Sequence, residues 1–401
     1  MASSKWKTYQ ELEQKVKNKK VVFWGASNWI ERTLNKIKLP VAYIVDKSKL
    51  NQGIKYNNLE IFSPEKLKQE KKDKIFIIIS TANYASVIDE LHLIGFIMGE
   101  NFCCSPELNQ RKNKDDILEH KQTLLISSQQ HWFDHKSGGG IYKYSTNPKK
   151  IKKVYSGKCR GIAKFKNQYY VVDMLKGIVI LDKNFKQIKL INIQKNSEPH
   201  GITIDQNTKK LYLSQPGRDS IAAYSLKTNK LVKEFHLSHK WKLNRKDNHH
   251  INDLCIHEQS IYVAIFSFSG NWLSEIYDGG ILELDKDSGK IIGPIVSGLW
   301  MPHSVSRIQG KISYLNSMMG ELYSGNKNKL TAINGFARGL DFDGKYYYIG
   351  VSEHRYPEKL QNISNNIGLN TGFYIFDPET NMTKFFPLPM AETIHSVILT
   401  I

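Results

Sequence analysis

One short pattern recurs six times between residues 160 and 398 and strongly limits how the chain can fold. Each copy has a polar residue, then a small or polar residue, then an aliphatic residue, at the start of a strand-like stretch. The copies begin at Arg160, His200, Asn252, His303, Arg338 and His395. Their spacings of 40, 52, 51, 35 and 57 residues are typical of four-stranded β-propeller blades. The sequence therefore predicts a six-bladed β-propeller over residues 122–401.

The two ends of this region complement each other. The sixth copy supplies a single strand, residues 395–401, whereas three strand-like stretches at residues 123–127, 140–145 and 150–155 precede the first copy. Together they would form one four-stranded blade, which removes an open sheet edge. We expect the ring to close in this way, with strands from both ends of the region.

The chain before the propeller has a different pattern. Apolar runs at residues 20–25, 40–46 and 74–80 alternate with helix-like stretches, which is typical of a parallel α/β sheet. We expect a multidomain protein with a Rossmann-like α/β domain at residues 1–115 and a linker at residues 116–121. The all-β propeller follows this linker.

The turn after the first apolar run has part of a phosphate-binding layout. Gly25, Ala26 and Ser27 would offer backbone N–H groups, and Asp46 ends the second apolar run 21 residues after Gly25, where a dinucleotide site places its ribose-binding acid. The turn has one glycine where the full fingerprint has three. A purely structural or docking module is therefore the alternative.

These two turns also carry a resemblance. The runs at residues 24–27 and 43–46 resemble short Rossmann-like modules attached to sugar-modifying enzymes of bacterial surface-polysaccharide pathways, and the likeness covers about residues 18–110. The resemblance implies a nucleotide or nucleotide sugar as the cofactor of this domain, and the dinucleotide layout would also suit NAD.

The charge of the chain has no focus. The net charge is +19, but the 57 basic residues are spread almost evenly, and only eight of them are arginines, the side chain best suited to phosphate and base contacts. We therefore expect no nucleic-acid partner. The sequence has no apolar run long enough to span a membrane, no signal-peptide pattern and no disulfide spacing among its four cysteines. These features predict a reduced, cytoplasmic protein without a membrane partner.

The six pattern-opening residues should surround one end of the propeller axis. Histidine occupies every second position, as His200, His303 and His395. Three converging imidazoles would bind zinc or another divalent transition metal. The two arginines of the ring, Arg160 and Arg338, would bind an anionic group of a substrate.

Other side chains complete the predicted site. Asn252 would orient the substrate, and Asp173 or Glu353 would act as a general base if buried nearby. The loops at this mouth also contain His131, His135, Trp272 and His354. The alternative is a polar channel whose side chains only hold water.

The propeller region also resembles a known group of proteins. Its Pro-His-Gly, Met-Pro-His-Ser and Arg-Gly-Leu-Asp motifs, which begin at Pro199, Met301 and Arg338, resemble those of an uncharacterised bacterial six-bladed propeller family. That resemblance implies the fold and no activity. The architecture is similar to the peptidyl-hydroxyglycine lyase propeller, which implies zinc held by His200, His303 and His395.

Two functions follow as hypotheses. The first is a metal-dependent lyase, hydrolase or epimerase that acts on a small anionic or sugar-derived substrate, in a bacterial polysaccharide or natural-product pathway. The second is a non-catalytic propeller scaffold in such a pathway, with the α/β domain serving for docking or nucleotide binding.

Overall fold

The structure is a computed structural model that describes residues 4–129, 138–354, 356–361, 363 and 367–400. The predicted mouth residues His131 and His135 lie outside the described residues. The chain divides into two compact units, Met1–Leu118 and Glu119–Ile401. None of the described helices is sufficiently long and apolar to span a membrane.

The first unit is an α/β sheet with both faces covered. Its six strands lie in the order β3-β4-β2-β1-β5-β6. The strands are β1 Lys20–Trp24, β2 Val41–Val45, β3 Lys55–Tyr56, β4 Leu59–Phe62, β5 Ile75–Ile79 and β6 Phe102–Cys104. All neighbours pair in parallel except β3 and β4, which are antiparallel. The sheet is therefore mixed: its parallel centre agrees with the predicted parallel α/β sheet, whereas the antiparallel pair β3 and β4 was not predicted.

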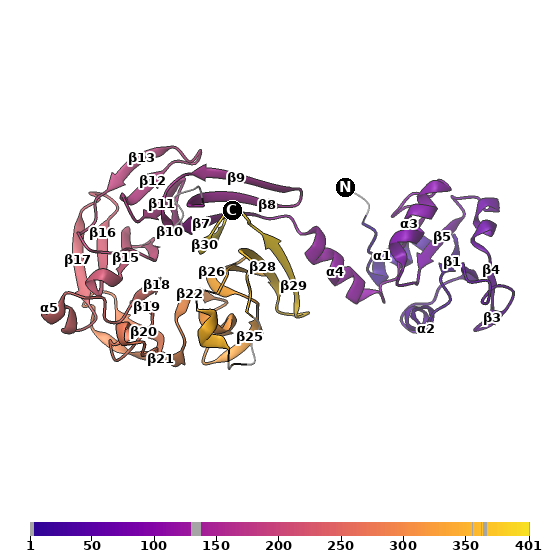
Figure 1. Ribbon diagram of the computed structural model, residues 1–401. Coiled ribbons are helices and arrows are strands. Elements are labelled where there is room, and N and C mark those ends of the chain that lie inside the picture. Colours follow the sequence, from indigo (N-terminus) through magenta and orange to yellow (C-terminus); the bar gives the residue numbers. More distant parts are fainter. Residues whose placement is uncertain (1–3, 130–137, 355, 362, 364–366, 401) are drawn as a thin grey trace. The chain divides into compact units, whose positions relative to one another are not determined.

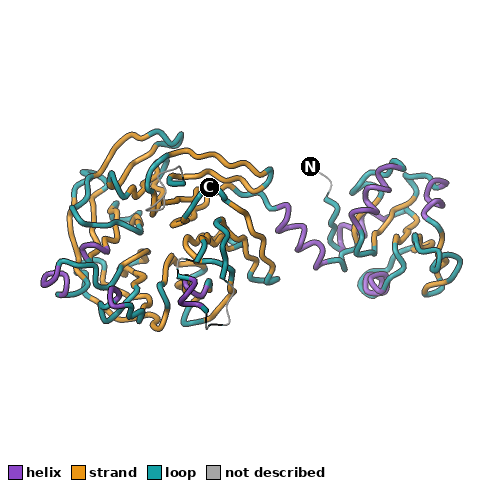
Figure 2. Tube along the Cα trace, in the orientation of Figure 1, coloured by secondary structure: helices purple, strands orange, loops and turns teal. Residues whose placement is uncertain are grey.

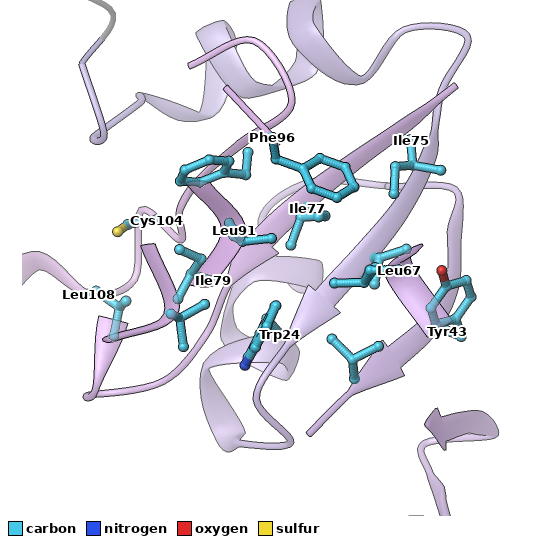
Figure 3. Packing of buried hydrophobic residues seen from close by; sticks show 14 residues of the cluster. Trp24, Tyr43, Leu67, Ile75, Ile77, Ile79, Leu91, Phe96, Cys104 and Leu108 are labelled. Atoms are coloured by element: carbon cyan, nitrogen blue, oxygen red, sulfur yellow. The ribbon is translucent and has the colours of Figure 1, made fainter. Parts of the chain in front are cut away.

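The helices of this unit bury the alternating side chains of the strands. The helical segments are α1 Tyr9–Val16, α2 Asn28–Leu34, η1 Pro64–Gln69, α3 Tyr84–Leu93 and α4 Asn109–Glu119. Successive β1 residues belong to different cores, because side chains alternate across a strand: Phe23 packs with α1 and α2 residues, whereas Trp24 packs with Leu91 of α3. Figure 3 shows Trp24 and Leu91 within the core that Trp24 shares with α3.

The second unit consists of six four-stranded antiparallel sheets around a common centre, so the prediction of six blades is confirmed (Figure 1). Blade 1 contains β10 Cys159–Phe165, β11 Gln168–Asp173, β12 Gly177–Leu181 and β13 Gln187–Ile191. Blade 2 contains β14 Ile202–Asp205, β15 Lys210–Gln215, β16 Ser220–Ser225 and β17 Leu231–His236. Blade 3 contains β18 Ile251–His257, β19 Ser260–Ile265, β20 Gly279–Asp285 and β21 Ile291–Leu299. Blade 4 contains β22 Pro302–Ile308, β23 Lys311–Asn316, β24 Glu321–Ser324 and β25 Asn328–Ala332. Blade 5 contains β26 Phe336–Phe342, β27 Tyr347–Ser352, β28 Gly372–Asp377 and β29 Met382–Pro387.

The sixth blade joins both ends of the unit. Its order is β30-β7-β8-β9, with β30 Thr393–Leu399 innermost, followed by β7 Thr123–Gln129, β8 Gly140–Thr146 and β9 Lys149–Tyr155. The register pairs Val397 with Ile126 and Leu399 with Leu124. This arrangement is the closure that the sequence predicts, and Figure 2 shows the strands of all six blades around the centre.

Short helical turns follow the second strands of four blades. They are η2 Pro216–Arg218, η3 Trp272–Ser274, η4 Ser317–Met319 and η5 Pro357–Leu360, and helix α5, Lys240–Asn244, lies between blades 2 and 3. Because second strands run antiparallel to the inner strands, these turns border the end of the channel at which the inner strands begin. The innermost strands are β10, β14, β18, β22, β26 and β30.

Candidate functional site at the propeller axis

The recurring pattern coincides with a local irregularity at the start of the inner strands. In five of them the pairing with the second strand shifts register, between Cys159 and Ile162, Ile251 and Leu254, His303 and Ser306, Ala337 and Leu340, and Ile394 and Ser396. In blade 2, His200 lies two residues before the first residue of β14. Such bulges redirect side chains, and they are frequent beside active sites. The six ring residues therefore lie where the strands leave regular pairing.

Small residues after the ring positions allow neighbouring blades to approach closely. The N–H of Gly161 donates to the carbonyl of His200 at 3.0 Å, and the N–H of Gly201 donates to that of Asn252 at 3.2 Å. A Cβ atom on Gly201 would lie 2.6 Å from Cα of Asp253. The glycines of the motifs thus have a structural reason, which is the contact between inner strands of adjacent blades.

All six inner strands line the central channel. Its cavity has a volume of about 350 Å³, and His395 is among the lining residues. Asp253 also lines it, and its carboxylate accepts hydrogen bonds from the backbone N–H of Ser304 at 2.7 Å and from its hydroxyl at 3.2 Å. Burial raises the pKa of Asp253 above its ordinary value. The channel is therefore polar beneath the ring.

Arg338 links two of the three ring histidines. Its Nε donates to Nε2 of His303 at 3.1 Å, and its Nη1 lies 3.4 Å from Nε2 of His395. Nδ1 of His303 lies 2.9 Å from the carbonyl of Met301, to which it donates, so His303 is neutral with an accepting Nε2. The guanidinium also lies 4.7 Å from the ring centroid of Phe336 and is only 4% exposed. These contacts fix its position.

Arg160 is held in a comparable way beside the third histidine. Its Nε donates to Oε1 of Gln129 at 2.9 Å and its Nη1 to the carbonyl of Pro199 at 3.1 Å. The same Nη1 lies 2.8 Å from Nδ1 of His200. Arg160 is 7% exposed, so its charge is largely withdrawn from water.

The two arginines create a positive potential at the ring. The pKa of His200 lies well below its ordinary value because the imidazole is buried and because the charges of Arg160, His250, His395 and Arg338 disfavour a further proton. His200 is therefore neutral at physiological pH. Its ring centroid lies 6.4 Å from that of His395.

The sixth ring residue is buried with the others. Asn252 is 1% exposed, and its Nδ2 lies 3.5 Å from the carbonyl of His250. The structure thus buries all six ring residues. Close contacts join Arg160 with His200, His200 with His395, and His395 through Arg338 with His303.

The fit of a metal ion can be judged from the nitrogen atoms of the ring. Nε2 of His303 accepts a hydrogen bond from Arg338, and the same guanidinium lies beside Nε2 of His395. Within the described residues, no group of three or more His, Cys, Asp and Glu side chains is placed to hold a metal ion. The donor set in this arrangement does not fit zinc, because a guanidinium lies against two of the three predicted ligands. Zinc binding by His200, His303 and His395 stays a prediction.

The two predicted general bases have other surroundings. Asp173 is buried, and its carboxylate accepts hydrogen bonds from the hydroxyl of Tyr155 at 2.9 Å and from the N–H of Leu175 at 3.0 Å. This pattern is that of a turn cap which also joins blade 1 to blade 6. Glu353 is exposed to solvent, so it lacks the burial on which its predicted role depends.

The predicted cofactor turn of the α/β unit is occupied by its own chain. Oδ2 of Asp46 accepts the N–H of Ala26 at 2.8 Å, and Oδ1 accepts the N–H of Ser48 at 2.8 Å. Ser27 caps α2 and donates its hydroxyl to the carbonyl of Ser80 at 2.6 Å. Gly25 has a φ of 104°, which only glycine adopts readily. Asp46 therefore takes the N–H group that a phosphate would use.

Sequence reasoning missed several side chains of the axial site. They are Gln129, Asp247, Phe266 and Phe336. Asp247 had a detectable signal, because an acidic residue three positions before a histidine can hydrogen-bond to it in a turn. The aromatic residues had none, since only the folded ring brings them to the axis.

The fold and the buried ring define a six-bladed β-propeller with an arginine- and histidine-lined axial site. Residues 231–383 match a protein family described as a domain of unknown function (DUF4915). The match covers less than half of the chain and includes Asn252, His303 and Arg338. No curated protein matches the chain.

Two solved structures are similar to this chain. A chain of the crystal structure of a nidogen/laminin complex is 10% identical, with a TM-score of 0.52, and the match covers 70% of this chain and 98% of that one. A protein of unknown function from Bacteroides caccae is 13% identical, with a TM-score of 0.49, covering 69% and 98%. At such identities the nidogen/laminin likeness supports the propeller fold alone.

Proposed function

We propose that the axial end of the propeller binds a small anionic, sugar-derived molecule through a carboxylate group. The observation that carries the proposal is the pair of buried guanidiniums of Arg160 and Arg338, each held around the same ring by hydrogen bonds to amide, carbonyl or imidazole groups. A guanidinium presents a planar fork of donors that matches a carboxylate. Because both forks are already fixed, ligand binding costs little side-chain entropy.

The remaining ring residues suit the hydroxyl groups of such a ligand. Asn252 has both a donor and an acceptor, and neutral imidazoles, such as that of His200, likewise offer one of each. Burial and the neighbouring positive charges lower the pKa of His200, and the same charges favour an anion over a cation at this position. A metal-dependent reaction is the less favoured form of this proposal, because Arg338 contacts two of the three predicted ligands.

The proposal assigns no ligand to the α/β unit. A Rossmann-like, nucleotide-binding role remains a prediction from Gly25, Ala26, Ser27 and Asp46. The hydrogen bond from Ala26 to Asp46 weighs against it, because a phosphate would have to displace a carboxylate. The alternative, a purely structural or docking module, needs no phosphate at this turn.

Isothermal titration calorimetry tests the proposal. The probes are D-glucuronate, L-lactate and inorganic phosphate, each titrated into the full chain. Arg338→Met should weaken the affinity for D-glucuronate about 10- to 100-fold, since a charge-assisted hydrogen bond contributes about 1.5–3 kcal/mol. The matched control is Arg307→Met. It removes an exposed arginine from β22, the inner strand of blade 4, which precedes the blade that contains Arg338, and it should change the affinity less than about two-fold.

Two results would contradict the proposal. One is the absence of binding for all three probes. The other is an equal loss of affinity in the Arg307 and Arg338 variants, which would mean that the general charge of the protein, and not the axial ring, attracts the anion.

A further inference from the structure

A histidine beside the ring is held by a carboxylate. Nδ1 of His250 lies 2.5 Å from Oδ2 of Asp247, and the backbone N–H of His250 donates to Oδ1 at 2.9 Å. Both side chains are largely withdrawn from solvent, with exposed fractions of 14% and 11%. With Nδ1 bound to the carboxylate, Nε2 is the nitrogen that can accept a proton from a ligand.

The backbone at this position is strained. His250 has a φ of 48°, in the left-handed region that non-glycine residues seldom adopt. The conformation brings the imidazole back onto the side chain of Asp247, three residues earlier. The surrounding structure must hold such strained residues in place, and they cluster at active sites.

The position of the imidazole links it to the axial ring. Its centroid lies 5.2 Å from that of His200, which in turn contacts Arg160 and lies beside His395. On its other sides it packs against Phe266 at 4.4 Å and Trp272 at 4.2 Å. The indole Nε1 of Trp272 also donates to the backbone carbonyl of Asp247 at 3.0 Å, which fixes the aromatic wall and the turn together.

We propose that His250 is a general base that removes the proton from the carbon bearing the carboxylate of a sugar acid, and that Asp247 positions it. This inference rests on the proposed function, since Arg160 and Arg338 would hold the carboxylate. The half-buried face of Trp272 would lie against the sugar ring.

The step balances without another reactant. The C–H bond breaks, Nε2 of His250 gains the proton, and the electron pair moves into the carboxylate to form an enediolate. The two guanidiniums stabilise the added negative charge. The imidazolium, stabilised by Asp247, then returns a proton to the same carbon, so a proton from solvent can replace the original one. Proton exchange is common to epimerases and to lyases that eliminate a neighbouring oxygen group.

Solvent exchange measures this step directly. The full chain is incubated with D-glucuronate in D₂O, and deuterium at carbon 5 is followed by NMR and mass spectrometry, while calorimetry reports binding. We expect exchange in the wild type, a loss of at least about 100-fold in His250→Gln, and unchanged D-glucuronate affinity within about three-fold. His257→Gln, at the far end of β18, is the control and should exchange at the wild-type rate.

Asp247→Asn tests the positioning role. We expect the maximal exchange rate to fall at least about 10-fold while the concentration of D-glucuronate for half-maximal rate stays within two-fold. A merely structural aspartate would change both or neither. Circular dichroism checks that each variant is folded, and if His250→Gln unfolds, the Asp247→Asn result decides.

The outcomes separate this inference from the proposed function. Binding of D-glucuronate without deuterium incorporation overturns the catalytic role of His250 and leaves the anion site intact. Exchange that persists in His250→Gln also overturns it. Absence of binding overturns the proposed function, and this inference with it.

Discussion

Replacing Gly201 by alanine should destabilise the propeller because the inner strands of blades 2 and 3 have no space for a methyl group. The added Cβ would lie 2.6 Å from Cα of Asp253 and 2.8 Å from the carbonyl oxygen of Asn252. Both neighbours are backbone atoms, so relief requires the two blades to separate. Such overpacking costs about 1–3 kcal/mol, and it would also weaken the hydrogen bond from Gly201 to Asn252.

Gly293→Ala is the matched control for this change. No atom lies within 4 Å of a Cβ placed on Gly293 of β21, and its φ is not in the left-handed region. Alanine there should be neutral or should stabilise the protein by up to about 1 kcal/mol. Thermal unfolding followed by near-ultraviolet circular dichroism should show a Tm lowered by roughly 2–10 °C for Gly201→Ala and not for Gly293→Ala. Equal Tm values for the two variants would refute the reasoning from close approach.

Three other predictions concern charges. Arg160→Met should raise the pKa of His200, measured by NMR, although burial still keeps that pKa below 6.5; an unchanged value would show that Arg160 does not set the local potential. Because the folded-state pKa of His200 is lowered, its stabilising contribution is complete above pH 6.5 and is lost as the pH falls below that value, by up to about 1.4 kcal/mol per pH unit. The free energies of unfolding of wild type and His200→Asn, measured by urea titration, should therefore depend differently on pH below 6.5. Parallel pH dependences of the two proteins would contradict this. Lys286→Met should lower the free energy of unfolding by about 3–5 kcal/mol at pH 7, because it removes the Nζ that lies 2.8 Å from Oδ2 of the buried Asp205, a carboxylate whose pKa is lowered to about 2. A loss below about 1 kcal/mol would exclude this ion pair as an important link between blades 2 and 3.

Much of the propeller follows from the sequence because its blades repeat. The six pattern-opening residues predict the number of blades, and the strands before Arg160 and after His395 predict the closure that β30 and β7 form. The motif glycines are needed because the inner strands approach closely, so this signal is a direct consequence of packing.

The chemistry of the ring is less predictable than its position. Alternating histidines suggest a metal site, but the sequence does not show that Arg338 donates to His303 and lies beside His395. Nor does it show that Asp46 accepts the N–H of Ala26, since both a ribose-binding acid and a turn cap occupy such a position. These contacts depend on side-chain directions that only the folded backbone fixes.

A crystal structure of the protein soaked with D-glucuronate, with anomalous data collected at the zinc edge, tests the axial site most directly. The proposal predicts density for the ligand at the ring, with its carboxylate within hydrogen-bond distance of Arg160 or Arg338. An anomalous peak held by His200, His303 and His395, with both guanidiniums turned away and no ligand density, would contradict it.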